Sequence, residues 1–224
     1  MKTLITSFIL LIGILSQTTA QDVNEKKISM SLGPQNAFYV EIPGSDLKMA
    51  EKTFYEIIKE YGKLKENKKA REHFMMATKI PVINGSSPLD VYAKFEEGKG
   101  MTTTFVWMDM GGAFINSNEY GSQAKSLKQF MSDYFIAVRK KVVTEELKVE
   151  EKKLADVEKD LKKLKDKNDD YHQDIEKAKQ KIVEAEKNIE KNVVDQENKV
   201  KEIDDQKSSV QKVVEKLNNL GKKN

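Results

Sequence analysis

Few side chains in this sequence have the types and spacing that chemistry requires. The nearest approach to a metal-binding set lies in the second half of the chain and comprises Asp169, Asp170, His172 and Asp174. At helical spacing these four side chains spread around much of the helix circumference, so we interpret them as a solvated surface. The chain has no cysteine and two histidines. That composition excludes disulfides, thiolate zinc sites and cysteine nucleophiles, and it leaves little room for histidine acid–base chemistry.

Two further patterns resemble parts of active sites. Asp109 follows the apolar run 105–108 and precedes Gly111-Gly112, which is a carboxylate at the end of a strand. No G-x-x-x-x-G-K-[ST] loop accompanies it, so a P-loop NTPase is rejected. Ser122 and Ser126 have no histidine or other base within a recognisable motif. The sequence therefore predicts a protein that is not an enzyme, with no catalytic residue, cofactor or metal site.

A short basic run is the remaining candidate for binding. It consists of Lys63, Lys65, Lys68, Lys69 and Arg71. Such a run can contact lipid headgroups, an acidic polymer or an acidic protein surface. Glu66 interrupts it and no aromatic residue is interleaved, so the alternative interpretation is a solvated loop. The whole chain has a formal net charge of +3, which is too balanced to indicate nucleic acid.

The first twenty residues predict export. Lys2 precedes an apolar stretch of 12 residues, Leu4–Leu15, and Thr18 and Ala20 supply small residues at a cleavage site. Twelve apolar residues are too few to span a bilayer, which needs about 20. We expect cleavage after Ala20, a periplasmic or secreted location, and no transmembrane span in the mature chain.

Residues 21–140 have the patterns of a small α+β domain. Alternation over 38–42 predicts a strand, Ser45 is a plausible N-cap, and three- and four-residue spacing over 50–61 predicts a helix that Gly62 ends. Residues 72–80 predict a second strand, with Phe74, Met76 and Thr78 on one face. The segments 89–97 and 101–110 predict a hairpin, 113–115 a short strand, and a helix is expected to begin near 116–118. The predicted order is β-α-β-β-β-α, with the helices on one face of an antiparallel sheet.

The remaining segment, 141–224, has a different composition. Of its 84 residues, 21 are basic and 21 acidic, and its only aromatic residue is Tyr171. A segment of this kind cannot close a core by itself. Seven-residue spacing instead predicts a coiled coil. We assign its seam to Leu147, Leu154, Val157, Leu161, Leu164, Asn168, Tyr171, Ile175, Ile182, Ile189, Ile203, Val210 and Leu217.

The residues that flank this seam favour parallel pairing of two copies. In a parallel dimer each g residue faces the e residue of the partner's next heptad. Five such pairs have opposite charge: Lys153–Glu158, Asp160–Lys165, Asp174–Lys179, Lys181–Glu186 and, after a stutter near Ile189, Lys199–Asp204. Glu146–Glu151 is repulsive. Asn168 at an a position also fits, because one buried Asn commonly fixes register. Small residues at Ala178 and Ala185 leave an antiparallel helical hairpin open, with its turn at 166–170 or 188–198.

The sequence thus predicts a signal peptide at 1–20, an α+β head at 21–140 and a coiled coil at 141–224. The function that fits best is an exported interaction protein whose heads are oligomerised by the coil; the partner of the head is not identified. The alternative is a periplasmic holdase, because the layout is similar to that of the Skp-like chaperones of outer-membrane proteins. In that family the chain returns from the helices into the β-body, whereas here it ends on the predicted helix.

Overall fold

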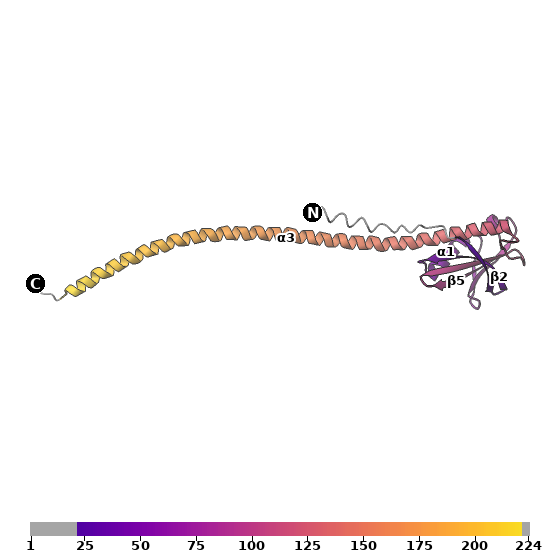
Figure 1. Cartoon of the computed structure of the whole chain (residues 1–224), viewed down its shortest axis with the longest axis horizontal. Helices are drawn as coiled ribbons and strands as arrows, with labels where there is room; N and C mark the ends of the chain where they lie inside the picture. Colours follow the sequence, from indigo (N-terminus) through magenta and orange to yellow (C-terminus); the bar gives the residue numbers. More distant parts are fainter. Residues whose placement is uncertain (1–21, 221–224) are drawn as a thin grey trace. The chain divides into compact units, whose positions relative to one another are not determined.

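The computed structural model describes residues 22–220, so the predicted signal peptide and cleavage site lie outside the described residues. The chain divides into two units, the first extending to Glu151 and the second beginning at Lys152. The first unit is the head. It contains a six-stranded sheet, two short helices and the start of a long one, as Figure 1 shows. The predicted α+β head with a long helix is confirmed.

The sheet is antiparallel throughout. In chain order its strands are β1 (Asn24–Met30), β2 (Gly33–Pro43), β3 (Lys65–Asn67), β4 (Glu72–Thr78), β5 (Leu89–Gly98) and β6 (Met101–Asp109). Their order in the sheet is β1-β2-β6-β5-β4-β3. The helices are α1 (Leu47–Ile58), α2 (Pro81–Asn84) and α3 (Gly121–Asn219). The predicted hairpin is confirmed, because β5 and β6 pair from Gly98↔Met101 onward.

Two strands that the sequence did not predict form the two edges of the sheet. β1 pairs with β2 from Asn24↔Tyr39 to Met30↔Gly33, and β3 pairs only with β4. Both edge strands carry charged residues, among them Lys26, Lys27 and Lys65. Charge and short length on an edge strand oppose pairing with another sheet. They also mask the apolar alternation by which a strand is recognised from sequence.

The turn from β2 into α1 corrects one prediction. Asp46, not Ser45, is the N-cap, and its side chain accepts a hydrogen bond from the backbone N–H of Met49 at 2.6 Å. The Ser45 hydroxyl is buried and donates to the carbonyl oxygen of Ile42 at 2.8 Å. The helix ends at Ile58, before the predicted stop at Gly62. Asp46 is the N-cap because its carboxylate reaches an unpaired N–H of the first helical turn, whereas the Ser45 side chain is directed back to the strand.

A bulge changes the predicted face of β4. The register with β5 shifts between Met75 and Thr78, and Ala77 has a positive φ of 50°. Phe74 and Met76 share the face toward Tyr92, as predicted, but Thr78 lies on the opposite face with the buried Met75, which corrects the predicted face that contained Phe74, Met76 and Thr78. An extra residue in one strand reverses the side-chain alternation that follows it. The strand also ends at Thr78 instead of residue 80.

The connection from β6 to α3 differs in detail from the prediction. The expected strand at 113–115 is reduced to a single bridge between Asp109 and Phe114. α3 begins at Gly121, and the residues where we expected its start form a turn. Asn116 builds that turn, because its Oδ1 accepts from the backbone N–H groups of Asn118 and Glu119.

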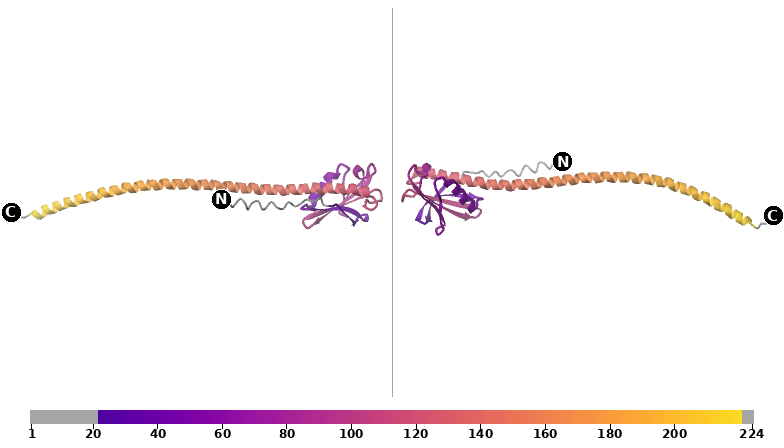
Figure 2. Two further views of the ribbon diagram at one scale, coloured as in Figure 1. Left: turned by 45° about the horizontal axis from the view of Figure 1, so that its top comes forward. Right: turned by 180° about the vertical axis from the view of Figure 1, so that it is seen from behind.

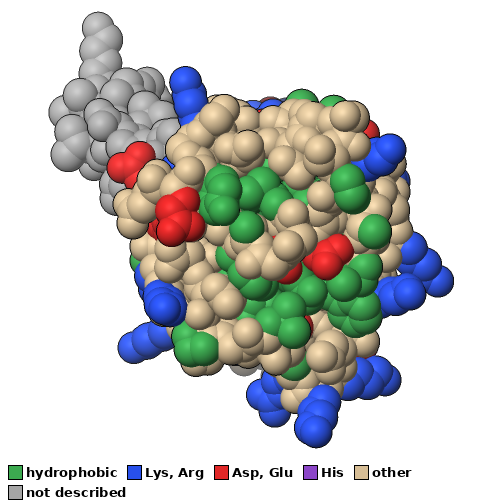
Figure 3. Space-filling view, turned by 90° about the vertical axis from the view of Figure 1, so that its right-hand side faces the viewer, with side chains coloured by type: hydrophobic (Ala, Val, Ile, Leu, Met, Phe, Trp, Pro, Cys, Tyr) green, Lys and Arg blue, Asp and Glu red, His purple; other side chains and the backbone are tan. Residues whose placement is uncertain are grey.

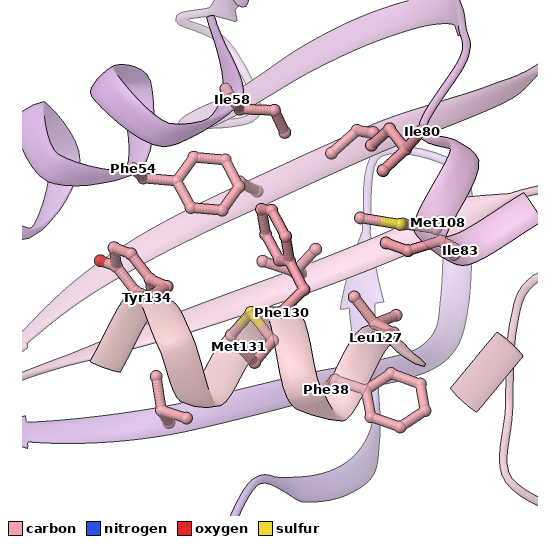
Figure 4. Packing of buried hydrophobic residues seen from close by; sticks show 14 of the residues in the cluster. Phe38, Phe54, Ile58, Ile80, Ile83, Met108, Leu127, Phe130, Met131 and Tyr134 are labelled. Carbon is pink, nitrogen blue, oxygen red and sulfur yellow. The ribbon is translucent and has the colours of Figure 1, made fainter. Parts of the chain in front are cut away.

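The main core lies between one face of the sheet and the helices of the head (Figures 1 and 2). Figure 4 shows Phe54 of α1 opposite Phe130 and Tyr134 of α3, and the rings meet edge to face at centroid distances of 6.2 and 5.4 Å. The α3 residues that are buried in the core are Ala124, Leu127, Phe130, Met131, Tyr134, Phe135, Val138 and Val142. This stripe at three- and four-residue spacing is the apolar face of an amphipathic helix.

A smaller cluster lies on the other face of the sheet. Trp107 is fully buried there, with Phe105, Tyr92 and Met30. The sheet curls enough for the β1–β2 turn to reach β4, where the backbone N–H of Ser31 donates to Glu72 at 2.9 Å. The curl explains how an aromatic face can be buried although the main core lies on the opposite face.

Candidate functional site

The acidic cluster that most resembled a metal set is spread along α3. Asp169, Asp170, His172 and Asp174 are all exposed. Among residues 22–220, no group of three or more His, Asp or Glu side chains is arranged to hold a metal ion. These four side chains therefore form part of the solvated surface of the helix.

Asp109 has a structural task at the end of β6. Its Oδ1 accepts hydrogen bonds from the backbone N–H groups of Gly111 and Gly112, at 3.0 and 2.6 Å. Both glycines have positive φ, near 100° and 93°. The carboxylate that resembled a strand-end catalytic group thus holds a tight turn before α3.

His73 is packed among groups of the main core. Its Nε2 lies 3.0 Å from Oε1 of Glu51, and its ring stands edge-on to Tyr55 and Phe95. Nearly all of the side chain is inaccessible to solvent. These contacts connect β4 to α1, and they explain the position of His73 as a packing residue of the head.

The basic run lies at the β3 edge of the sheet. All five side chains, Lys63, Lys65, Lys68, Lys69 and Arg71, are exposed, and they occupy β3 and the turns on either side of it. Lys63 and Lys65 also line a shallow pocket of about 190 Å³ beside Met75 and Met76. Protection of a free sheet edge explains the placement of these charges. Binding of an anionic partner at this patch stays a prediction.

One end of the head presents apolar side chains to solvent. Figure 3 shows them gathered on that face with a few acidic groups among them and with Lys and Arg at the rim. Large exposed hydrophobic residues of the head include Leu32, Met76 and Val82. A patch of this kind is a candidate surface for protein contact.

The predicted seam occupies α3, and its side chains do not contact a second helix within the described chain. Its twelve apolar members from Leu147 to Leu217 are each 52–66% exposed, and Asn168 is exposed with them. A dozen large apolar side chains in one repeat are unusual on a solvated surface, whereas single ones are ordinary. The seam is the most extensive candidate interaction surface of the second unit.

The structure removes one alternative that the sequence left open. α3 is helical without interruption from Gly121 to Asn219, through both 166–170 and 188–198. Within the described residues the chain therefore forms no helical hairpin.

Several of the charged residues beside the seam pair within the helix. Lys163 lies 2.8 Å from Asp160, and Lys199 lies 2.6 Å from Glu202. The hydrogen bond to Glu202 raises the pKa of Lys199. Exposed pairs of this kind contribute little and exchange readily for other partners. They leave the charges of the seam flanks available for contacts between chains.

Sequence reasoning missed two residues that extend the seam. Ile136 and Val143 lie fourteen and seven residues before Glu150, which is the d position of the heptad that begins with Leu147 at a, and they are 41% and 46% exposed. The seven-residue spacing was visible in the sequence. It was masked because the same segment also carries the apolar stripe of the head.

Comparison with known proteins gives no family for the chain: no family model, curated protein or solved structure matches it. Within residues 22–220, no helix is both long enough and apolar enough to cross a membrane. The proposals below therefore rest on the residues and their placement.

Proposed function

We propose that this chain is an exported, non-enzymatic interaction protein whose heads are joined by a parallel coiled coil of two copies. The observation that carries the proposal is the exposed apolar seam on an uninterrupted helix. Burial of that seam against a second copy would remove most of it from water, at roughly 25 cal/mol per Å². We take the partner to be a second copy of this chain, because the apolar repeat of the seam is complementary to itself.

The flanking charges support the direction of pairing. Five of the g-to-e′ contacts in a parallel dimer join opposite charges, as in Lys181–Glu186 and Lys199–Asp204. Exposed ion pairs are weak individually, but a consistent pattern selects between alternative alignments. Asn168 supports the same register, because its amide meets the partner's amide when the two copies are aligned.

Two linked heads bind a repetitive or surface-bound partner more tightly than one. The gain comes from the effective concentration of the second head once the first is bound. The apolar end of the head (Figure 3) and the basic patch at β3 are the surfaces that support this use. Export, predicted from residues 1–20, would present such heads in the periplasm or outside the cell.

The proposal is tested by melting the mature chain at two concentrations about a hundredfold apart. Helicity reports α3, which holds most of the helical residues, and the fluorescence of the single tryptophan, Trp107, reports the head. We expect the helical transition to move to higher temperature with concentration, because association stabilises the bound state by mass action. The tryptophan transition shows whether the head unfolds together with the helix. A helical transition that stays fixed, with a monomeric mass by light scattering, would refute the homodimer.

A further inference from the structure

Within the head, α3 has two apolar faces. The face toward the sheet carries the buried residues Met131, Tyr134 and Val138. On the outer side Ile136 and Val143 are exposed at 41% and 46%. An ordinary surface helix has one apolar face, so the second face calls for a partner of its own.

The outer face is in phase with the predicted seam. At 3.6 residues per turn, Ile136, Val143 and Leu147 lie about 140–180° around the helix from Val138. Counting back in sevens from Glu150 gives Val143 and Ile136 the d positions of two earlier heptads. The first seam residue, Leu147, therefore points away from the sheet and continues a line that begins inside the head.

The contacts of α3 with the rest of the head leave this face open. Arg139 donates to the carbonyl oxygen of Pro43, and Lys141 pairs with Glu56 of α1, each at 2.5 Å. By the same helical count, Arg139 lies about 100° to one side of Val138 and Lys141 about 60° to the other. The side chains that join α3 to the rest of the head thus lie on either side of the buried face. The outer face, on the opposite side of the helix, carries neither of them.

The a position between the two exposed d residues is Lys140, which is also exposed. A single Lys at an a position is tolerated in two-stranded coils and disfavours larger assemblies. The next a position upstream is Asp133, whose carboxylate accepts a hydrogen bond from Gln129 at 2.9 Å. In a parallel pair Asp133 would add a second pair of facing like charges to that at Lys140, so we place the end of the contact between Asp133 and Ile136.

We infer that the second copy also docks on the outer face of α3 inside the head, from Ile136 to Leu147. The inference rests on the proposed coiled coil and extends it: the heads are part of the dimer interface and lie on opposite outer sides of the paired helices. Glu146, the g residue of the one repulsive pair, fits this arrangement. Its Oε1 lies beside the β2–α1 turn, 3.7 Å from where a Cβ on Gly44 would be. The Glu146 carboxylate thus lies toward its own head, and this position reduces its repulsion with Glu151 of the second copy.

Disulfide trapping tests the inference, because the chain has no cysteine of its own. Four single variants of the mature chain are oxidised mildly: Ile136→Cys, Val143→Cys, Leu147→Cys and, as a matched control, Val149→Cys. Val149 is 53% exposed but lies only about 20° from Val138 around the helix, away from the seam. Disulfides form when two Cα atoms come within about 7 Å, as the a and d residues of a parallel pair do. Trp107 fluorescence checks that each head is folded.

We expect the first three variants to form disulfide-linked dimers at least about tenfold faster than Val149→Cys, because a bound copy is held at high effective concentration. Fast linking at 147 with slow linking at 136 and 143 would overturn the inference and leave the coiled coil intact. Slow linking at all four positions would overturn both. Equal rates at all four would mean that random encounters link the chains, and would also overturn the inference.

Discussion

The hydroxyl of Tyr134 joins three parts of the head. It donates to the carbonyl oxygen of Ala50 in α1 at 3.0 Å. Having one proton, it must then accept from Thr104 of β6, which is 2.9 Å away. The whole arrangement is buried. At the residue scale the long helix is therefore fixed to the head by a hydrogen-bonded polar group as well as by apolar packing.

Replacing Tyr134 with Phe should lower the free energy of unfolding of the head by about 1–3 kcal/mol. The buried hydroxyl of Thr104 would lose its partner, and an unpaired buried donor is costly. Urea unfolding followed by Trp107 fluorescence measures the change. The double variant that also carries Thr104→Val should recover part of the loss, since no unpaired hydroxyl then remains. Equal stability of Tyr134→Phe and the parent would show that the hydroxyl pairs weakly.

Alkaline unfolding provides a control for the same variant. Burial raises the pKa of Tyr134 well above the usual 10.0, and the hydrogen bond with Thr104 offsets part of the rise. The folded head thus holds this proton more tightly than the unfolded chain, so the contribution of Tyr134 to stability is constant below pH 10 and is lost as the pH rises above it. One such group contributes up to about 1.4 kcal/mol per pH unit. Tyr134→Phe should show a shallower fall.

At the scale of elements, α3 changes the way it is stabilised along its length. Up to Val142 its apolar face is buried by the sheet and α1, and Gly44 allows close approach: with φ of +75°, a Cβ there would lie 2.9 Å from Val142. From Lys152 onward every described residue is exposed. Intrahelical pairs such as Lys163–Asp160 stabilise that part by a few tenths of a kcal/mol each. The second part of the helix gains most from a partner.

Replacing Asn168 with Ile should raise the melting temperature of the helix and weaken its choice of register. A buried Asn at an a position gives specificity at a cost in stability, and Ile removes that cost. Helicity against temperature measures the first effect, and light scattering detects a change in the number of copies, which a buried Asn fixes together with register. Asn198→Ile, at an outer f position, is the matched control and should not raise the melting temperature. A drop in stability for Asn168→Ile would mean that the seam has been assigned to the wrong face.

At the scale of the whole molecule, pairing of two copies determines how many heads act together. The proposed parallel direction of helix pairing depends on charges that lie on α3 and are exposed in the single chain. Because each pair is weak, only combined changes can test the direction. Reversing three charges on the seam flank, or three on the side of α3 opposite the seam, gives two variants of equal net charge.

The seam-flank variant carries Lys153→Glu, Lys181→Glu and Lys199→Glu; the control carries Lys152→Glu, Lys187→Glu and Lys201→Glu. The first places like charges opposite Glu158, Glu186 and Asp204 of the other copy. We expect a loss of about 1–3 kcal/mol per dimer at low salt, recovered in part as salt screens the repulsion. Sedimentation at several salt concentrations measures it. Equal losses in the two variants would mean that the chains do not pair in parallel.

The sequence by itself determined the β5–β6 hairpin and the α+β class of the head with a long helix after it. It could do so because these features depend on local periodicity and on Gly at tight turns, as at Gly98 and Gly100. The seam assignment is still a prediction from the sequence, and pairing along that seam is a proposal. The seven-residue pattern of the seam is repeated many times along the chain, so no single residue decides it.

Only the tertiary structure decided the edge strands, the β4 bulge and the double use of α3. β1 and β3 are strands because neighbours offer them hydrogen bonds, not because their own residues favour a strand. Ala77 adopts a positive φ where its N–H meets Asp90, thirteen residues away, at 2.6 Å. Ile136 and Val138 are both apolar and differ only in whether the sheet covers them. Such choices depend on contacts between residues far apart in the chain, which local periodicity does not contain.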